Sequence, residues 1–271
     1  MTTDELKKIA SAVRQRVIEL SHSAGTPHLG SSLSCIDVLV AAYWSVLKID
    51  PDKPLDPDRD RFILSKGHAA LALYVTLSKR GFFSEETLAT YNRDGGRLAE
   101  HPGPGCVPGV EAATGSLGHG LPLGVGMALA ARIQGRSHRV IVLMSDGECN
   151  EGSVWEAAML APAQRLDNLT AVVDYNKWQA TARSNETLSL APLRAKWEAF
   201  GWDAVEIDGH DMDAVVGMLA KGPNGSRKPR MIVAHTVKGR GVSFMEDDNN
   251  WHYRIPNAEE VRKATRELQL S

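Results

Sequence analysis

Two segments decide the fold: Val140-Ile-Val-Leu-Met144 followed by Ser145-Asp146-Gly147-Glu148, and Leu169-Thr-Ala-Val-Val173 followed by Asp174-Tyr175-Asn176-Lys177-Trp178. Each begins with a short apolar run rich in β-branched residues and ends abruptly in polar residues, which is typical of buried parallel strands. Residues 150–165, between them, have helical spacing. The two segments therefore predict a β-α-β unit in which Asp146 and Asn176 follow adjacent strands, at the edge where open α/β sheets bind ligands.

The oxygen atoms expected at this edge suit a hard divalent cation. Asp146 offers a carboxylate, Asn176 an amide oxygen, and the turn a backbone carbonyl, whereas Mg²⁺ takes its other ligands from phosphate and water. The helix after the first strand points its amino end to the same place, where free amides and the helix dipole favour an anion. Gly147 lets a ligand approach the backbone closely, and Glu148 is interpreted as a helix-start residue. The pattern predicts a metal-bridged diphosphate.

The bulk properties exclude several classes of protein. The 271 residues are 43% hydrophobic with a net charge of −2, and no basic stripe points to nucleic acid. No apolar run is long enough to cross a bilayer, and the charged N-terminus is unlike a signal peptide. The three cysteines, Cys35, Cys106 and Cys149, lack metal-ligand spacing and form an odd set, so we expect a reducing cytoplasm.

The remaining sequence alternates between helical and strand patterns. Further strands are expected at 61–64, 203–207 and 230–235. Helices are expected at 3–21, 35–48 (after a Ser-rich turn at 30–34 whose Ser caps it), 67–80, 117–136, 191–199, 211–220 and 257–269. This alternation predicts an α/β fold with a parallel sheet flanked by helices on both faces. No linker or repeat divides the chain, so residues 1–271 are expected to form one domain, and the Gly- and Pro-rich loop at 94–116 is expected to be functional.

Histidines form a second group of candidate site residues, and most of them adjoin Gly or Pro in segments expected at one edge of the sheet. They are His28, His68, His101, His119 and His252. Imidazoles can donate to phosphate, orient hydroxyl groups and shuttle protons near neutral pH. We hypothesise that they converge. The run Lys238-Gly239-Arg240-Gly241, after the strand at 230–235, suits anion binding.

Together these motifs resemble the thiamine diphosphate-binding half of transketolases. The Asp-Gly-Glu and Asn-Lys pair is similar to that family's metal and diphosphate signature. The resemblance covers nearly the whole chain. The other matching motifs are His28–Ser34, Asp60–His68, His101-Pro102, Gly109–Met127, Lys238–Gly241 and Trp251-His252.

The resemblance implies thiamine diphosphate bound through Mg²⁺, with Ca²⁺ or Mn²⁺ as substitutes. The metal ligands it implies are the side chains of Asp146 and Asn176 and the carbonyl of Trp178. The cofactor-binding residues it implies are His68, Gly115, Ser116, Leu117, Gly147, Glu148, Asn176 and Lys238. The catalytic residues it implies, facing the donor sugar, are His28, His101 and His252.

Three departures from the family pattern are visible. Ser145 replaces the first Gly of the usual Gly-Asp-Gly turn, and His119 stands where many members have Gln. The chain also ends after the diphosphate-binding domain, without the domain that supplies a Glu to the aminopyrimidine. We therefore expect the N-terminal subunit of a split transketolase, paired with a C-terminal subunit in an α₂β₂ assembly. The implied reaction transfers a two-carbon ketol unit from a ketose or its phosphate to an aldose or its phosphate.

Other functions stay open from the sequence. The chain could be half of another thiamine diphosphate enzyme, such as a deoxyxylulose phosphate synthase-like, dihydroxyacetone-transferring or 2-oxoacid-converting one, although His28, His68 and His101 favour ketose handling. It could be an inactive regulatory homologue, for which Ser145 is the only hint. A nucleotide-binding protein would need a Gly-rich phosphate loop of a form that is missing.

Overall fold

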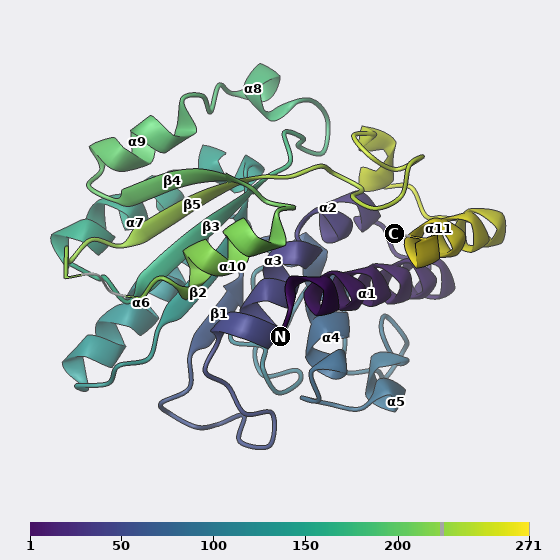
Figure 1. Ribbon diagram of the computed structural model, residues 1–271, viewed down its shortest axis with the longest axis horizontal. Helices are drawn as coiled ribbons and strands as arrows, with labels where there is room; N and C mark the ends of the chain where they lie inside the picture. The colour runs from purple at the N-terminus through teal and green to yellow at the C-terminus, as the bar shows by residue number, and fades with distance from the viewer. Residues whose placement is uncertain (223–224, 271) are drawn as a thin grey trace.

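The computed structural model describes residues 1–222 and 225–270. Its centre is a sheet of five strands in the order β1-β2-β3-β5-β4, in which every neighbouring pair is parallel (Figure 1). The strands are β1 (Arg61–Leu64), β2 (Val140–Ser145), β3 (Leu169–Tyr175), β4 (Asp203–Asp208) and β5 (Arg230–His235). The strands are those expected from the apolar runs, and the parallel sheet is confirmed.

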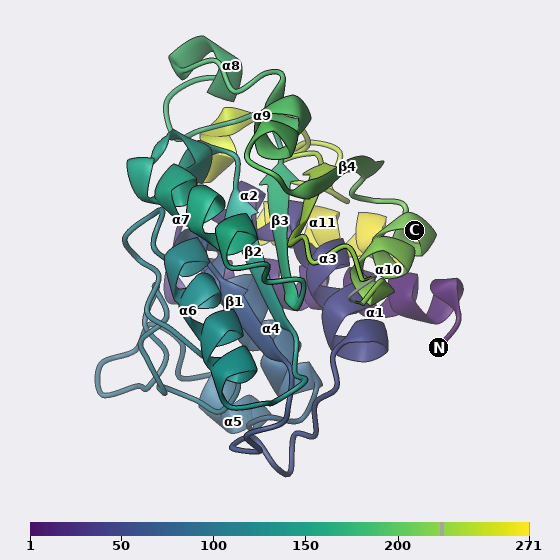
Figure 2. The same ribbon diagram turned by 90° about the vertical axis from the view of Figure 1, so that its left-hand side faces the viewer.

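Helices cover both faces of this sheet (Figure 2). One face carries α1 (Thr3–Ala24), α3 (Ile36–Ala41), α4 (Ala70–Lys79), α10 (Met212–Ala220) and α11 (Ala258–Leu270). The other carries α6 (Gly120–Ile133), α7 (Gly152–Ala163) and α9 (Leu193–Ala199). Alternate residues of β2 divide between the two cores, since Ile141 and Leu143 pack into the first and Val140, Val142 and Met144 into the second. No helix within the described ranges is long and apolar enough to span a membrane.

Short helices fill several connections. They are α2 (Leu29–Ser34), the π-helical turn η1 (Ala42–Val46), the 3₁₀ turns η2 (Gly67–Ala69), η3 (Gly147–Asn150) and η4 (Asn249–His252), and the one-turn helices α5 (Glu85–Leu88) and α8 (Ser184–Thr187). The long loop expected at 94–116 contains neither helix nor strand.

The Ser-rich turn predicted before residue 35 is wrong in detail. Residues 29–34 form the helix α2, and Cys35 stands at the start of α3 without a side-chain capping bond. The hydroxyl of Ser34 donates to Oδ2 of Asp174 at 2.6 Å and does not accept a hydrogen bond from an amide of α3. The contact with a buried carboxylate of β3 directs this hydroxyl toward the sheet, so tertiary structure and not the local turn sets its place.

The carboxyl ends of four strands meet along one edge of the sheet. His68 lies just beyond β1, Asp146 just beyond β2, Asn176 just beyond β3 and Lys238 three residues beyond β5. All five strands run the same way, so residues from distant parts of the sequence arrive at one place.

Candidate active site

Asp146 and Asn176 lie next to each other where β2 and β3 end. Their turns are joined by a hydrogen bond, because the backbone N–H of Lys177 donates to Oδ2 of Asp146 at 2.8 Å. The amide oxygen of Asn176 accepts the N–H of Trp178 at 3.0 Å, which fixes the side chain against its own turn. The structure thus brings together the two side chains predicted to ligate a metal.

The Asp146 carboxylate is completely buried, at 0% exposure. It accepts hydrogen bonds from the Gly147 N–H at 2.9 Å and from the Ser184 hydroxyl at 2.8 Å. Burial raises the pKa of Asp146 to about 6. No group of three or more His, Cys, Asp or Glu side chains within residues 1–222 and 225–270 could hold a metal. A metal bound here would therefore use one carboxylate, an amide oxygen and main-chain or ligand oxygens, a donor set that fits a hard cation.

Trp178 is held firmly at the pocket wall. Its indole N–H donates to Asp247 at 2.7 Å, and the Arg183 guanidinium stacks over its ring at 3.7 Å. Arg183 and Asp247 also form an ion pair, with a 2.6 Å contact. These contacts fix the backbone of the segment that is predicted to offer a carbonyl ligand.

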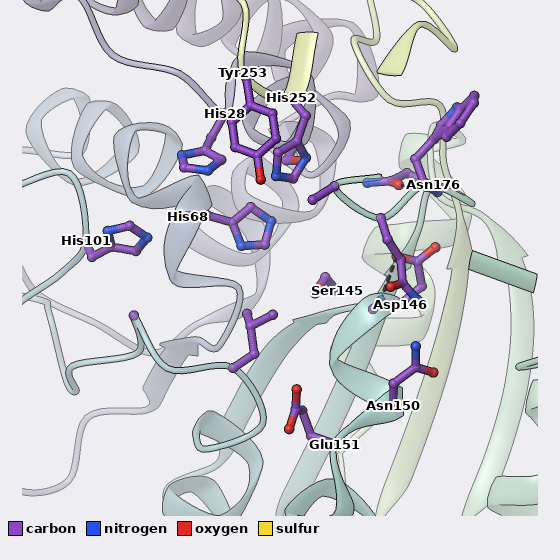
Figure 3. A pocket seen from close by; sticks show the side chains of 17 residues that line it. His28, His68, His101, Ser145, Asp146, Asn150, Glu151, Asn176, His252 and Tyr253 are labelled. Carbon is purple, nitrogen blue, oxygen red and sulfur yellow. Dashed lines mark hydrogen bonds between the residues drawn. The ribbon is translucent and has the colours of Figure 1, made fainter. Parts of the chain in front are cut away.

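Four histidines converge on the same pocket, as we hypothesised (Figure 3). The ring centre of His28 lies 5.6 Å from that of His68, 5.9 Å from that of His101 and 5.0 Å from that of His252. The rings come from the residue before α2, from η2, from the long loop and from η4, so neither local spacing nor periodicity could place them. His119 is not in this group: it is exposed at the start of α6.

The buried imidazoles favour their neutral form. Burial holds the pKa of His68 well below its usual range and also lowers the pKa of His28. Burial and then the neighbouring Lys238 lower the pKa of His252 to about 3. A neutral imidazole has one donor and one acceptor nitrogen, so these rings can both orient hydroxyl groups and exchange protons with them.

The pocket has a volume of about 370 Å³. Ten of the predicted site residues line it: His28, His68, His101, Gly115, Leu117, Asp146, Gly147, Asn176, Trp178 and His252. Three predicted cofactor contacts, Ser116, Glu148 and Lys238, do not line it. Ser116 is exposed to solvent, whereas Glu148 and Lys238 are completely buried behind the wall.

Lys238 supports the wall from behind. Its Nζ lies 2.7 Å from Oδ1 of Asn249 and 3.0 Å from Nδ1 of His252. Burial lowers the pKa of Lys238 to about 7. Gly239 is needed next to it, because its φ is +80° and an added Cβ would lie 2.1 Å from the carbonyl oxygen of Met245. Lys238 thus contacts the turn η4 through Asn249 and His252, while Arg240 of the same basic run pairs with Glu246.

Glu148 ties three segments together. Its carboxylate accepts the N–H of Gly118 at 3.1 Å, the N–H of Ser145 at 2.8 Å and the hydroxyl of Ser65. The helix α7 starts only at Gly152, so Glu148 is neither a helix-start residue of α7 nor, in this structure, a lining residue of the pocket. Its role is to fix the ends of β1 and β2 against the loop that leads into α6.

The comparison with protein families agrees with this geometry. The family described as "Transketolase, thiamine diphosphate binding domain" matches residues 5–271. The chain belongs to the transketolase family. Binding of thiamine diphosphate follows from this membership.

Two relatives are similar over almost their full length, and both are named as single subunits of a transketolase. The apulose-4-phosphate transketolase subunit of Phocaeicola vulgatus is 42% identical over 268 residues, which cover 99% of this chain and 95% of the relative. The 6-deoxy-6-sulfo-D-fructose transketolase subunit SqwG of Clostridium sp. is 41% identical over 265 residues, which cover 98% and 96%. They confirm the prediction of an N-terminal subunit of a split transketolase.

Solved transketolases share the fold. The enzyme from Leishmania mexicana matches with a TM-score of 0.91 and 26% identity, covering 97% of this chain and 41% of that structure. The enzyme from Campylobacter jejuni matches with a TM-score of 0.91 and 27% identity, covering 99% and 43%. The chain thus spans about two fifths of these solved transketolases, and the α/β thiamine diphosphate-binding fold is confirmed.

Ser145, which departs from the transketolase pattern, fits without strain. It is the last residue of β2 and is not among the residues with positive φ, so the position does not require glycine. Its N–H and hydroxyl both contact Oε2 of Glu148, at 2.8 and 3.3 Å. The extra hydroxyl therefore has a hydrogen-bond acceptor in the neighbouring Glu148 carboxylate.

A buried ion pair beneath the site was missed by the sequence analysis. Lys66 and Asp174 are both completely buried and contact each other directly. Burial alone would lower the pKa of Lys66, but Asp174, together with Cys35 and Asp146, outweighs burial and raises that pKa. Asp174 also accepts the hydroxyls of Ser34 and Thr236. The pair joins the ends of β1, β3 and β5 to α2. The sequence offered one signal for this pair: Asp174 is a charged residue at the end of the apolar run that begins at Leu169.

Several pocket residues were also missed. Asn150, Gln179 and Tyr253 line the cavity but were not predicted to do so. Oδ1 of Asn150 and Nε2 of Gln179 are buried and have no hydrogen-bond partner among the described residues. Unpartnered polar atoms of this kind indicate a ligand or ordered water at the site, because burying them alone is unfavourable.

Proposed function

We propose that this chain binds thiamine diphosphate through Mg²⁺ and, together with a separate subunit, transfers a two-carbon ketol unit between sugars. One observation carries the proposal: oxygen donors at the ends of β2 and β3 and a cluster of histidines line the same pocket. The first group suits a metal diphosphate and the second suits a polyhydroxylated substrate. Ketoses and aldoses, free or phosphorylated, are the substrate class.

The residues present fit a metal-bound diphosphate. The Asp146 carboxylate and the Asn176 amide oxygen would hold Mg²⁺, with the Trp178 carbonyl as a third ligand and Ca²⁺ or Mn²⁺ as substitutes. A cation offsets the cost of burying the Asp146 charge. The unpartnered polar atoms of Asn150 and Gln179 support a polar occupant of the pocket.

The rest of the pocket would receive the organic part of the cofactor. Gly147 and His68 would contact the diphosphate, and Gly115 and Leu117 would lie beside the pyrimidine. Lys238 would act on the site through His252. When bound, thiamine diphosphate supplies an electron sink for cleavage of a carbon–carbon bond.

His28, His101 and His252 would handle the hydroxyl groups of the sugar. Positioned proton acceptors and donors of this kind accelerate reactions by about 10²–10⁴-fold. We expect His101→Ala to lower kcat by about 100-fold and to leave the cofactor dissociation constant within about threefold of wild type. Stopped-flow kinetics and calorimetry on the same preparation check both numbers, and a large loss of cofactor affinity would contradict the assignment.

We further propose that the chain is one domain and works with a C-terminal subunit in an α₂β₂ assembly. The relatives named as transketolase subunits support a divided enzyme. The partner would supply the pyrimidine-binding domain and the Glu that contacts the aminopyrimidine. The adjacent helices α6 and α7 have exposed apolar side chains that are available for such a contact: Leu123, Met159 and Leu160.

The three cysteines are unpaired thiols, which supports a reducing cytoplasm.

Product analysis tests the proposal. The chain is mixed with its C-terminal subunit, thiamine diphosphate and Mg²⁺, and given either a ketose phosphate with an aldose or pyruvate with an aldose. We expect a new ketose in the first reaction and no carbon dioxide in the second. Carbon dioxide release from pyruvate would show a 2-oxoacid-converting enzyme instead, and no turnover with any ketose would show an inactive homologue.

A further inference from the structure

Glu100 lies beside the histidine cluster and is not among the residues proposed to bind the cofactor or the sugar. It stands in the long loop, directly before His101. Its Oε1 is 2.9 Å from Nδ1 of His28, and its side chain is 33% exposed, whereas that of His28 is 14% exposed. A half-buried carboxylate against an imidazole that lines a substrate pocket changes what that imidazole can do.

The backbone holds the His28 ring in one direction. His28 precedes α2 with a φ of +66°, a left-handed conformation that is costly for a residue with a side chain. Its N–H donates to the carbonyl of His252 at 2.8 Å, and its carbonyl accepts the N–H of Ser32 at 3.0 Å. These bonds from two separate elements keep the residue in that conformation, so the ring stays in the pocket with one nitrogen toward Glu100.

The titratable groups that face His28 come from several elements packed against it. His68 on η2 and the pair His252 and Tyr253 face it, with ring centres 5.0 to 6.0 Å away. Burial lowers the pKa of His28, Glu100 raises it, and His101 and Lys238 lower it further. Glu100 is thus the group that opposes the loss of basicity caused by burial and by cations.

We propose that Glu100 is a positioning residue that holds the ring proton of His28 on Nδ1 and so leaves Nε2 as the base for a hydroxyl of the donor sugar. The inference deepens the proposed function and rests on it. The Nδ1–Oε1 contact has hydrogen-bond distance but not hydrogen-bond direction. Such contacts tighten when substrate closes a site.

The proton balance of this step is simple. The O–H proton of the donor passes to Nε2 of His28 as the bond between carbons 2 and 3 breaks. The O–H electron pair becomes the second bond of the new aldehyde, and the carbon–carbon pair stays with the two-carbon fragment. His28 is then an imidazolium whose Nδ1–H faces the Glu100 carboxylate, which stabilises it. The reverse transfer to the acceptor aldose returns the proton.

His252 complements His28 in this arrangement. A lysine ammonium has donors only, so when Lys238 is charged, Nδ1 of His252 accepts from it and the ring proton lies on Nε2. The pocket would then present one acceptor nitrogen, from His28, and one donor nitrogen, from His252. Two neighbouring hydroxyl or carbonyl oxygens of a ketose can use such a pair.

The first experiment reads His28 directly, without any reaction. The full chain, labelled with ¹⁵N in histidine, is titrated by NMR as wild type, as Glu100→Gln and as Asp94→Asn. Asp94 is an exposed carboxylate of the same loop and so matches the change of charge. In Glu100→Gln we expect a lower pKa of His28 and a shift of the ring proton from Nδ1 toward Nε2. In Asp94→Asn we expect neither. A His28 signal unchanged by Glu100→Gln overturns the proposal.

The second experiment measures turnover in the complex with the C-terminal subunit. Glu100→Gln should lower kcat by about 10- to 100-fold and change KM by less than about threefold. Without the carboxylate the pKa of His28 falls, so the acidic limb of the kcat/KM profile should move to lower pH. Glu100→Asp should restore part of kcat.

The outcomes distinguish a failure of the Glu100 role from a failure of ketol transfer by the complex. An active wild-type complex in which Glu100→Gln has the wild-type pH profile and rate overturns the positioning role alone. A wild-type complex that transfers no ketol unit overturns the proposed function, and the role of His28 as a base with it. In that case the NMR result still decides whether Glu100 sets the tautomer of His28.

Discussion

Asp146 is a carboxylate that the fold removes entirely from water. Three donors, the N–H groups of Gly147 and Lys177 and the hydroxyl of Ser184, already bind it. Even so, burial raises the pKa of Asp146 to about 6. The three donors therefore do not fully offset the negative charge of the buried carboxylate, and a divalent cation would do so.

Replacing Asp146 should abolish metal-dependent cofactor binding. Asp146→Ala removes the one carboxylate among the predicted ligands, so we expect the dissociation constant of thiamine diphosphate in the presence of Mg²⁺ to rise at least about 100-fold, the upper end of losses seen for outer-shell residues. Isothermal calorimetry with wild type and with Asp94→Ala as a control measures this. An affinity equal to that of wild type would show that the metal lies elsewhere.

Lys238 should give the fold a characteristic dependence on pH. Burial lowers its pKa to about 7 in the folded chain, against about 10.4 in an unfolded one. Between these values the unfolded state binds more protons, so the contribution of Lys238 to stability rises as the pH rises from 7 toward 10. Lys238→Met should lack this rise.

Thermal unfolding of both proteins from pH 6 to pH 10 checks the prediction for Lys238. The wild-type melting temperature, relative to that of Lys238→Met, should be lowest near pH 6 to 7 and increase toward pH 10. Hydrogen bonds lost with the side chain add an offset to the difference but do not create that slope. A difference independent of pH would contradict a buried, easily deprotonated lysine.

The sequence could place single residues only where they follow a strand. Asp146 and Asn176 were predicted to be neighbours because both end parallel strands, and the structure agrees. Glu100 and Tyr253 gave no local signal, because their importance depends on rings that come from other elements. The burial of Lys66 and Asp174 also depends on tertiary packing, because these two side chains pair with each other although they are 108 residues apart in the sequence.

At the scale of elements, periodicity was enough for most of the fold. The strands are short apolar runs, and helices such as α1 and α11 have a clear apolar stripe, so both kinds of element were predicted with ends within a few residues. The segments that differ are held by contacts distant in sequence. Residues 29–34 become helical while their hydroxyls and carbonyls bind Asp174 and Lys66, a partnership that no local pattern shows.

Glu148 should be the main link between the elements that frame the pocket. Its carboxylate holds the ends of β1 and β2 and the loop before α6. Glu148→Ala leaves those buried donors without an acceptor, so we expect a loss of about 2–4 kcal/mol in the free energy of unfolding. Glu148→Gln should lose less, since an amide keeps one acceptor oxygen.

Urea unfolding of these variants tests the role of Glu148. Glu186→Ala serves as the control, because this Glu is exposed on α8 and joins no element to another. Equal midpoints for Glu148→Ala and Glu186→Ala would mean that the three segments hold their positions without the carboxylate.

At the scale of the whole molecule, the pocket is built by one polypeptide, and in the proposed function it forms half of the active site. This chain aligns with about two fifths of solved transketolases, whereas it covers nearly all of the two relatives that are named as transketolase subunits. The oxygen donors proposed to bind a metal and the four clustered histidines lie in one pocket of this chain. In the proposed function, the Glu that contacts the aminopyrimidine comes from the partner.

The isolated chain should therefore transfer no ketol unit, even with saturating thiamine diphosphate and Mg²⁺. Adding the C-terminal subunit should restore turnover, and the rate should saturate at one partner per chain. Light scattering on the same mixture should give the mass of two copies of each subunit. His101→Ala should assemble to the same mass while turning over slowly, which separates assembly from chemistry. Full activity of the isolated chain would contradict the divided site, because the histidines and the metal ligands would then suffice without a partner's carboxylate.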